Sequence, residues 1–64
     1  MIINGKKRDF PSGTSVFSML EQLKLDPEKV VVEVNQGIVD KKAFEGHTLV
    51  TGDKIEIIAF VGGG

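Results

Sequence analysis

The sequence predicts a single α+β domain, in which a mixed sheet of four to five strands carries one main helix across one face. Three observations predict this class: an early hairpin signal, one segment with helical periodicity, and later segments dense in β-branched residues. The helix and the sheet would each have one apolar side, and packing the two sides together buries both. We expect the domain to span residues 1–61 and residues 62–64 to form a flexible tail.

The first expected element is a β-hairpin. Asn4-Gly5 separates two short extended segments, Met1–Ile3 and Lys6–Phe10. Both loop residues tolerate positive φ, as a two-residue type I′ turn requires. The Pro-Ser-Gly stretch at 11–13 then breaks the extended chain.

The helix is expected over residues 14–25. Its apolar positions recur at intervals of three and four, which predicts an apolar stripe along one side. The stripe contains Val16, Met19, Leu20 and Leu23. Thr14 or Ser15 can act as the N-cap by accepting a hydrogen bond from a first-turn N–H. The Asp-Pro pair at 26–27 is expected to end the helix, because the residue before proline is pushed out of the α region.

Further strands follow the helix. The valine-rich segment Val30–Val34 predicts a strand that is buried on much of both faces. A turn at 35–37 leads to a brief return strand, Ile38–Val39, whereas the polar stretch 40–48 shows no convincing regular element. The last strand is expected from Lys54 to Val61. This order of elements is that of the β-grasp fold of ubiquitin.

Side chains of the last strand alternate between its two faces. One face carries Ile55, Ile57 and Ala59, and the other carries Glu56, Ile58 and Phe60. Two interpretations of Ile58 and Phe60 stay open. Either the rest of the sheet or a loop covers them, or they form an apolar patch on which a partner docks. Docking is preferred, because two large apolar residues on that face would otherwise reduce solubility.

Composition excludes several classes of protein. With no Cys, the chain cannot form disulfides, thiolate metal sites, iron–sulfur clusters or a thiol nucleophile. Eight Lys and Arg against nine Asp and Glu give a net charge of −1, which would not attract nucleic acid. No apolar run approaches the ~18 residues of a membrane span. We therefore expect a cytoplasmic protein with neither a nucleic-acid nor a membrane partner.

An enzyme active site is not expected. The single His, His47, lies in a polar loop with no Cys partner and no metal-ligand spacing. The carboxylates are scattered through turns and polar faces, and so small a domain can hardly enclose a substrate pocket. We expect no bound metal and no bound cofactor.

Three consecutive glycines, Gly62, Gly63 and Gly64, directly follow the last strand. They cannot cradle phosphate as a P-loop does, since no helix follows them in the sequence. One interpretation is a frayed end or a remnant of cloning. The other is functional. Without Cβ atoms such a tail passes through a channel too narrow for other residues, and four residues past Phe60 reach ~13–14 Å. The α-carboxylate at the end of the tail could attack the α-phosphorus of ATP to form an acyl-adenylate. A second nucleophile would then readily attack the carbonyl carbon of this acyl-adenylate.

Several sequence features together resemble the ThiS family, the sulfur carriers of thiamine biosynthesis. They are the hairpin at Asn4-Gly5, the stretch Val34–Val39, Leu49 with the stretch Gly52–Ile57, and the terminal Gly-Gly. The resemblance covers essentially the whole chain and implies a β-grasp fold. It also implies that Gly64 is adenylated and then converted to a thiocarboxylate, with Gly62 and Gly63 threading into the partner.

The resemblance further implies three partners. An E1-like adenylyltransferase of the ThiF type would consume ATP, a sulfur donor such as a cysteine desulfurase would supply sulfur, and a thiazole synthase of the ThiG type would accept it. Three features depart from the family pattern. Gly62 is an added glycine where many members have another small residue, Phe44 stands where a larger aromatic is frequent, and Asp40-Lys41 replaces a frequent Pro-Arg or similar pair. These departures could alter partner contacts near that loop.

Three alternative functions stay open. The small sulfur-carrier subunit of molybdopterin synthase also ends in Gly-Gly but is usually longer. A ubiquitin-like modifier would be joined to lysines through Gly64. A plain β-grasp binding module would use no tail chemistry, and the balanced charge and few aromatic residues count against its binding RNA.

Overall fold

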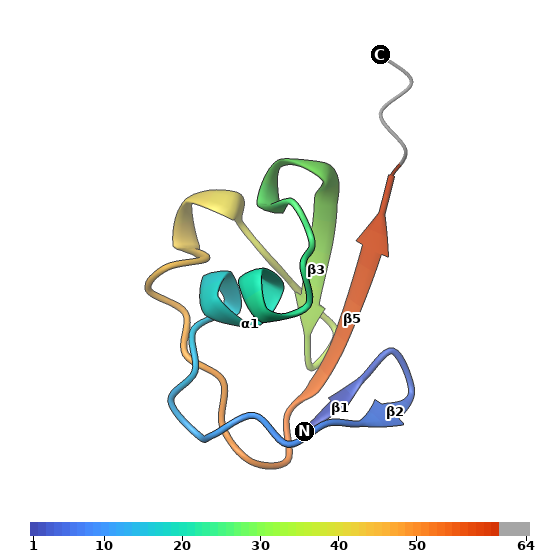
Figure 1. Ribbon diagram of the computed structural model, residues 1–64, viewed down its shortest axis with the longest axis vertical. Coiled ribbons are helices and arrows are strands. Elements are labelled where there is room, and N and C mark those ends of the chain that lie inside the picture. Colours follow the sequence, from blue (N-terminus) through green and yellow to red (C-terminus); the bar gives the residue numbers. More distant parts are fainter. Residues whose placement is uncertain (61–64) are drawn as a thin grey trace.

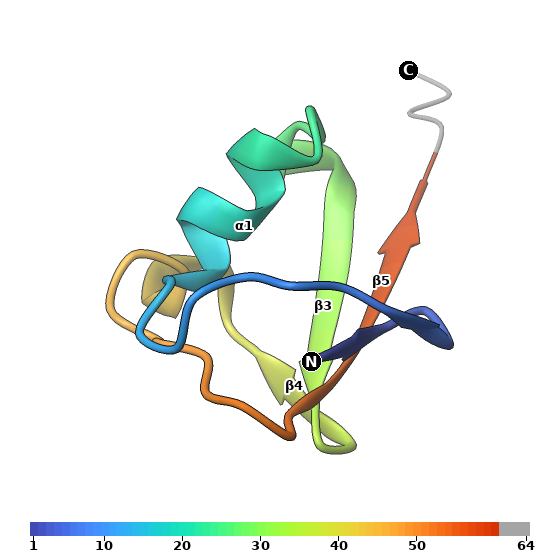
Figure 2. The same ribbon diagram turned by 60° about the horizontal axis from the view of Figure 1, so that its bottom comes forward.

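The computed structural model describes residues 1–60, which form a mixed sheet with one α-helix packed across one face (Figure 1). The strands are β1 (Ile2–Ile3), β2 (Lys6–Lys7), β3 (Val30–Val34), β4 (Gly37–Val39) and β5 (Lys54–Ala59). The predicted fold class and its β-grasp arrangement are confirmed. The helix, α1 (Val16–Gln22), lies on one side of β3 and β5 in both ribbon views (Figure 2).

The sheet order within the described residues is β2-β1-β5-β3-β4. β5 lies at the centre, parallel to β1 and antiparallel to β3, while both hairpins are antiparallel. The hairpin at Asn4-Gly5 is confirmed, because Ile3 pairs with Lys6 and both loop residues have positive φ. The strand expected over Lys6–Phe10 ends earlier, at Lys7.

The helix is shorter than predicted, although its N-cap is confirmed. The Ser15 side chain accepts a hydrogen bond from the Ser18 N–H at 3.0 Å. The sequence predicted that Asp-Pro at 26–27 ends the helix. This prediction is wrong, because α1 already ends at Gln22. Lys24 adopts a left-handed φ of 60°. Its N–H donates to the Glu21 C=O, and the Leu25 N–H donates to the Leu20 C=O. These bonds make a Schellman motif, with Lys at the position that usually holds Gly.

Two short 3-10 helices occupy connections where the sequence indicated none. They are η1 (Pro27–Lys29) and η2 (Lys41–Ala43). Each begins after an aspartate, Asp26 or Asp40, whose side chain accepts a backbone N–H two residues later. The absence of regular structure predicted for 40–48 is therefore wrong over η2, because the sequence signal for so short a turn is a single capping residue.

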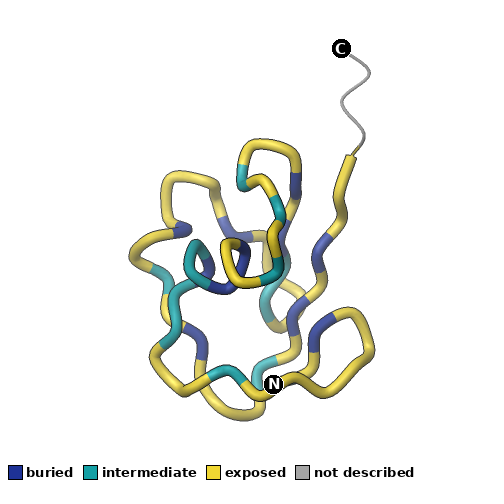
Figure 3. The backbone as a smooth tube through the Cα atoms, viewed as in Figure 1, coloured by how far each residue is buried: buried dark blue, intermediate teal, exposed yellow. Residues whose placement is uncertain are grey.

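The hydrophobic core lies between α1 and the sheet, and dark segments of the tube in Figure 3 mark its buried positions. Its buried members among residues 1–60 are Ile3, Val16, Met19, Leu20, Val30, Val32, Val39, Phe44, Leu49, Ile55 and Ile57. On β5, Ile55 and Ile57 face the core as predicted, but Ala59, the last residue of the strand, is exposed. Aliphatic packing thus supplies the core, and no buried polar side chain interrupts it in the described part of the chain.

Candidate functional site

The end of β5 carries two exposed apolar side chains. Ile58 is 56% exposed and Phe60 is 49% exposed, so the interpretation that the sheet or a loop covers them is wrong. Phe60 lies one residue beyond β5, yet its N–H donates to the Lys29 C=O at 3.0 Å. This bond continues the pairing of β5 with β3 by one residue, since Lys29 directly precedes β3. The backbone therefore holds both side chains in place at the end of the described residues.

Two further apolar side chains from β3 and β4 share the helix-free face. Val31 pairs with Ile58 in the strand register and is 36% exposed. Ile38 of β4 is 73% exposed. The sequence singled out neither residue, and for Val31 it predicted a strand buried on much of both faces. The polar Glu33 within the valine run is the signal that one face of β3 is open. We call Val31, Ile38, Ile58 and Phe60 the apolar patch.

A shallow hollow of about 500 Å³ runs beside this patch at the β3–β4 side of the sheet. The patch residues Val31, Ile38 and Phe60 line it, together with Glu28, Val30, Val39, Asp40, Lys41 and Phe44. Most of its lining is apolar, and its charged residues belong to η1, to η2 and to the N-cap of η2. Such a hollow is better suited to binding another protein than to catalysis, because it is open and mainly offers contact area.

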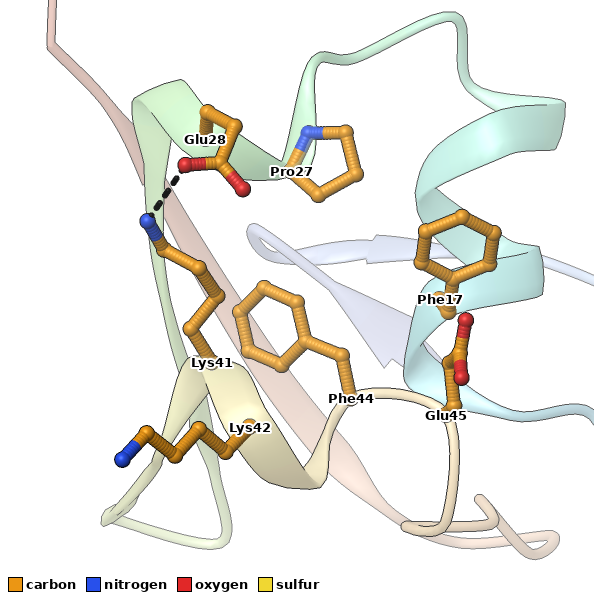
Figure 4. A pocket seen from close by; sticks show the side chains of 7 residues that line it. All are labelled: Phe17, Pro27, Glu28, Lys41, Lys42, Phe44 and Glu45. Carbon is orange, nitrogen blue, oxygen red and sulfur yellow. Dashed lines mark hydrogen bonds and ion pairs between the residues drawn. The ribbon is translucent and has the colours of Figure 1, made fainter.

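A second hollow of about 270 Å³ lies between α1 and the two short helices (Figure 4). The Lys41 ammonium bonds the Glu28 carboxylate at 2.7 Å across its mouth, and the Phe44 ring lies below this ion pair. Phe17 lines the opposite wall. The ion pair is exposed, so it contributes at most about 1 kcal/mol. The lining holds no hydroxyl, thiol or imidazole that could act as a nucleophile beside a base.

Other features bear on catalysis and location. Across residues 1–60, no group of three or more His, Cys, Asp or Glu side chains is placed to hold a metal ion. His47 takes part in the fold through its backbone, whose C=O accepts from the Val16 N–H at 2.9 Å. In the part of the chain that the structure describes, none of the helices has the length and hydropathy needed to cross a membrane.

The remaining predicted site residues are Gly62, Gly63 and Gly64, and they lie outside the described residues, as does Val61. The predicted division into residues 1–61 and 62–64 therefore stays a prediction. The two site residues that the structure does describe, Ile58 and Phe60, are two positions apart in the sequence and lie on one face of the sheet.

Curated relatives of this chain include longer proteins. Over 64 residues it is 42% identical to a thiazole synthase of Paramagnetospirillum magneticum, and over 62 residues it is 36% identical to a thiazole synthase of Magnetococcus marinus. The chain spans only 20% and 19% of the length of these relatives, while they cover 100% and 97% of the chain. A protein of Porphyra purpurea named ycf40 is 31% identical over 62 residues, which are 87% of its length.

Two solved structures are similar to this chain over nearly its whole length. The crystal structure of a thiamine biosynthesis protein, ThiS, from Geobacter metallireducens superimposes with a TM-score of 0.80 and 35% identity, covering 98% of this chain and 96% of that one. A solution structure of a thiamine biosynthesis protein from the same organism gives 0.78 with 35% identity, covering 98% and 85%. A family model described as the ThiS family matches residues 1–64. This β-grasp chain therefore belongs to the ThiS family.

Proposed function

We propose that this chain is a sulfur carrier of thiamine biosynthesis, and that Gly64 bears the carboxylate that is activated. The observation that carries the proposal is the ThiS family match over residues 1–64, which includes the glycines at its end. The described surface supports a carrier role, since its hollows are open and present contact area rather than a set of reacting groups. On this proposal partner enzymes supply the chemistry and the domain supplies recognition.

The proposed chemistry begins with a carboxylate. A carboxylate oxygen of Gly64 attacks the α-phosphorus of ATP and pyrophosphate leaves, which forms an acyl-adenylate. A sulfur nucleophile held by a donor protein then attacks the carbonyl carbon, and AMP leaves. If the donor is a persulfide, a second thiol breaks its S–S bond and releases a thiocarboxylate on Gly64. The glycines before it favour entry into a narrow active site, because they lack Cβ atoms.

The apolar patch is the proposed docking surface for the adenylyltransferase. Ile58 and Phe60 are exposed immediately before the tail, so an enzyme bound there would hold the tail beside its ATP site. A few well-packed residues near the centre of an interface commonly carry most of its binding energy.

The proposed acceptor of the sulfur is a thiazole synthase. The relatives from Paramagnetospirillum and Magnetococcus are named thiazole synthase, and about a fifth of each resembles this whole chain. A carrier and its acceptor joined in one chain meet at a high effective concentration. The fused relatives therefore support a separate thiazole synthase as the partner of this chain.

Intact-mass spectrometry tests the carrier chemistry. The chain is incubated with ATP, an adenylyltransferase of the ThiF type from the same cells, and a cysteine desulfurase with cysteine. The expected product is heavier by the mass difference between sulfur and oxygen, and the change maps to Gly64. Persistence of the unmodified carboxylate under these conditions would contradict the proposal.

Two control reactions sharpen the result. A variant that lacks Gly64 still ends in a carboxylate but is shorter by about 3.5 Å, so it should remain folded and gain no sulfur. Parallel reactions with the adenylyltransferase of molybdopterin synthesis separate the two pathways. Faster activation by that enzyme would assign the chain to the molybdopterin route.

A further inference from the structure

Two carboxylates lie directly opposite each other on the helix-free face. Glu33 of β3 and Glu56 of β5 are partners in the strand register, two positions along from the Val31–Ile58 pair. Residues opposite each other on one face of an antiparallel pair have Cβ atoms about 4.5–5.5 Å apart. Glu33 also pairs with Ile38 of β4. The acidic pair is therefore continuous with the apolar patch and belongs to the same surface.

The surroundings leave the acidic pair incompletely neutralised. Lys54 and Gln36 line the same shallow hollow of about 90 Å³ with the two carboxylates. Lys54 makes no ion pair with either one, since the ion pair found among residues 1–60 joins Lys41 to Glu28. One lysine charge for two carboxylates leaves a net negative site. Like charges opposite each other on a sheet are destabilising, so the isolated domain gains nothing from this arrangement.

The same charges disfavour a second copy of this chain as the occupant of the face. Two copies packed face to face around a two-fold axis bring the same surface patch together on both sides. Both acidic pairs, Glu33 with Glu56 in each copy, would then be desolvated in one interface beside the apolar patches. Unpaired charges taken out of water are costly, whereas a partner with a cation at this position would neutralise the repulsion.

We propose that Glu33 and Glu56 bind a basic side chain of the activating enzyme, next to the apolar contacts of Val31 and Ile58. An arginine fits best, because its planar guanidinium presents five N–H donors and can bond two carboxylates at once. This inference rests on the proposed function, which places that enzyme on the apolar patch. It adds a specificity element, since an enzyme with an acidic or neutral surface there would leave both carboxylates unpaired.

The test compares affinity with stability in the same variants. E33Q and E56Q each remove one charge and keep the shape of the side chain. Each should weaken binding of the purified adenylyltransferase about tenfold, while the denaturant midpoint of the isolated chain stays equal or rises. Binding by the wild type should also weaken with added salt more steeply than binding by the E33Q/E56Q double variant. The matched control is E21Q, which removes an exposed charge from α1 on the opposite side of the sheet.

Each outcome decides the matter. Unchanged affinity in E33Q and E56Q, with wild-type binding intact, would overturn this inference and leave the proposed function standing. An equal loss in E21Q would show a general effect of net charge and would also overturn it. A wild-type dimer in sedimentation that I58A dissociates would show that a second copy occupies the face. If the wild type fails to bind the enzyme at all, the proposed docking fails together with this inference.

Discussion

The side chain of Asn4 hydrogen-bonds both backbone polar groups of Ile57, a residue 53 positions away in the sequence, as a neighbouring strand would. Its Oδ1 accepts from the Ile57 N–H at 2.7 Å, and its Nδ2 donates to the Ile57 C=O at 3.2 Å. One step earlier the Asn4 N–H itself donates to the Ile55 C=O at 2.9 Å. The chain turns away at Asn4, so the amide group continues the parallel pairing of β1 with β5 for one more residue. The two bonds tie the first hairpin to the central strand.

Replacing Asn4 should destabilise the domain in two separable parts. N4G removes both side-chain bonds but keeps the freedom needed for the φ of 51°, and it should lower the free energy of unfolding by about 1–2 kcal/mol. N4A should lower it by about 1 kcal/mol more, because alanine pays to enter the left-handed region. Urea unfolding measures both values. Equal stability of N4G and the wild type would show that the amide bonds contribute nothing.

The two hairpins provide a matched comparison of turn residues. Both have two-residue loops with positive φ, but the second position is Gly5 in one and Gln36, with φ of 74°, in the other. Q36G should raise the free energy of unfolding by about 0.5–1 kcal/mol, which is a few degrees in Tm. The reverse change G5Q should lower it by about 1 kcal/mol. A Cβ at Gly5 would meet no atom within 4 Å, so backbone strain alone would cause this loss.

Adjacent isoleucines on β5 separate folding from docking. Ile57 is buried in the core and Ile58 is exposed on the apolar patch. I57A should cost about 2–4 kcal/mol of stability through loss of buried methyl groups and the cavity left behind. I58A should lower stability by no more than about 1 kcal/mol and weaken adenylyltransferase binding about tenfold. F60A should behave as I58A does, and a large loss of stability in either would favour a structural role instead.

Asp53 makes part of the stability dependent on pH. Hydrogen bonds from the Val50 N–H and the Asn35 amide, each 2.9 Å long, hold the pKa of Asp53 below its ordinary value. A carboxyl whose pKa is lowered by folding stabilises the fold above its unfolded pKa of about 3.9, and this contribution is lost as pH falls through the folded pKa. The stability gap between wild type and D53N should therefore be constant near neutral pH and shrink below about pH 4. D9N, at an exposed aspartate, is the control and should show a smaller gap near neutral pH.

Much of the local structure could be predicted because its causes are local. The Asn-Gly dipeptide specifies its own turn through positive φ, Ser15 caps the helix that begins beside it, and β-branched residues form β3 as expected. The face of β5 that carries Ile58 also follows from alternation along one strand. In each case the residues that determine the conformation lie within a few positions of it.

The end of the helix and the composition of the docking surface depend on distant contacts. Lys24 enters the left-handed region although lysine disfavours it, because the chain must bring Leu25 back against the core. The pairing of Val31 with Ile58 and of Glu33 with Glu56 depends on the register between strands more than twenty residues apart. Alternation tells which face a side chain is on, but a register is set only when turns and core packing align two strands. For this reason the sequence alone indicates Ile58 and Phe60, whereas the folded sheet reveals the acidic pair beside them.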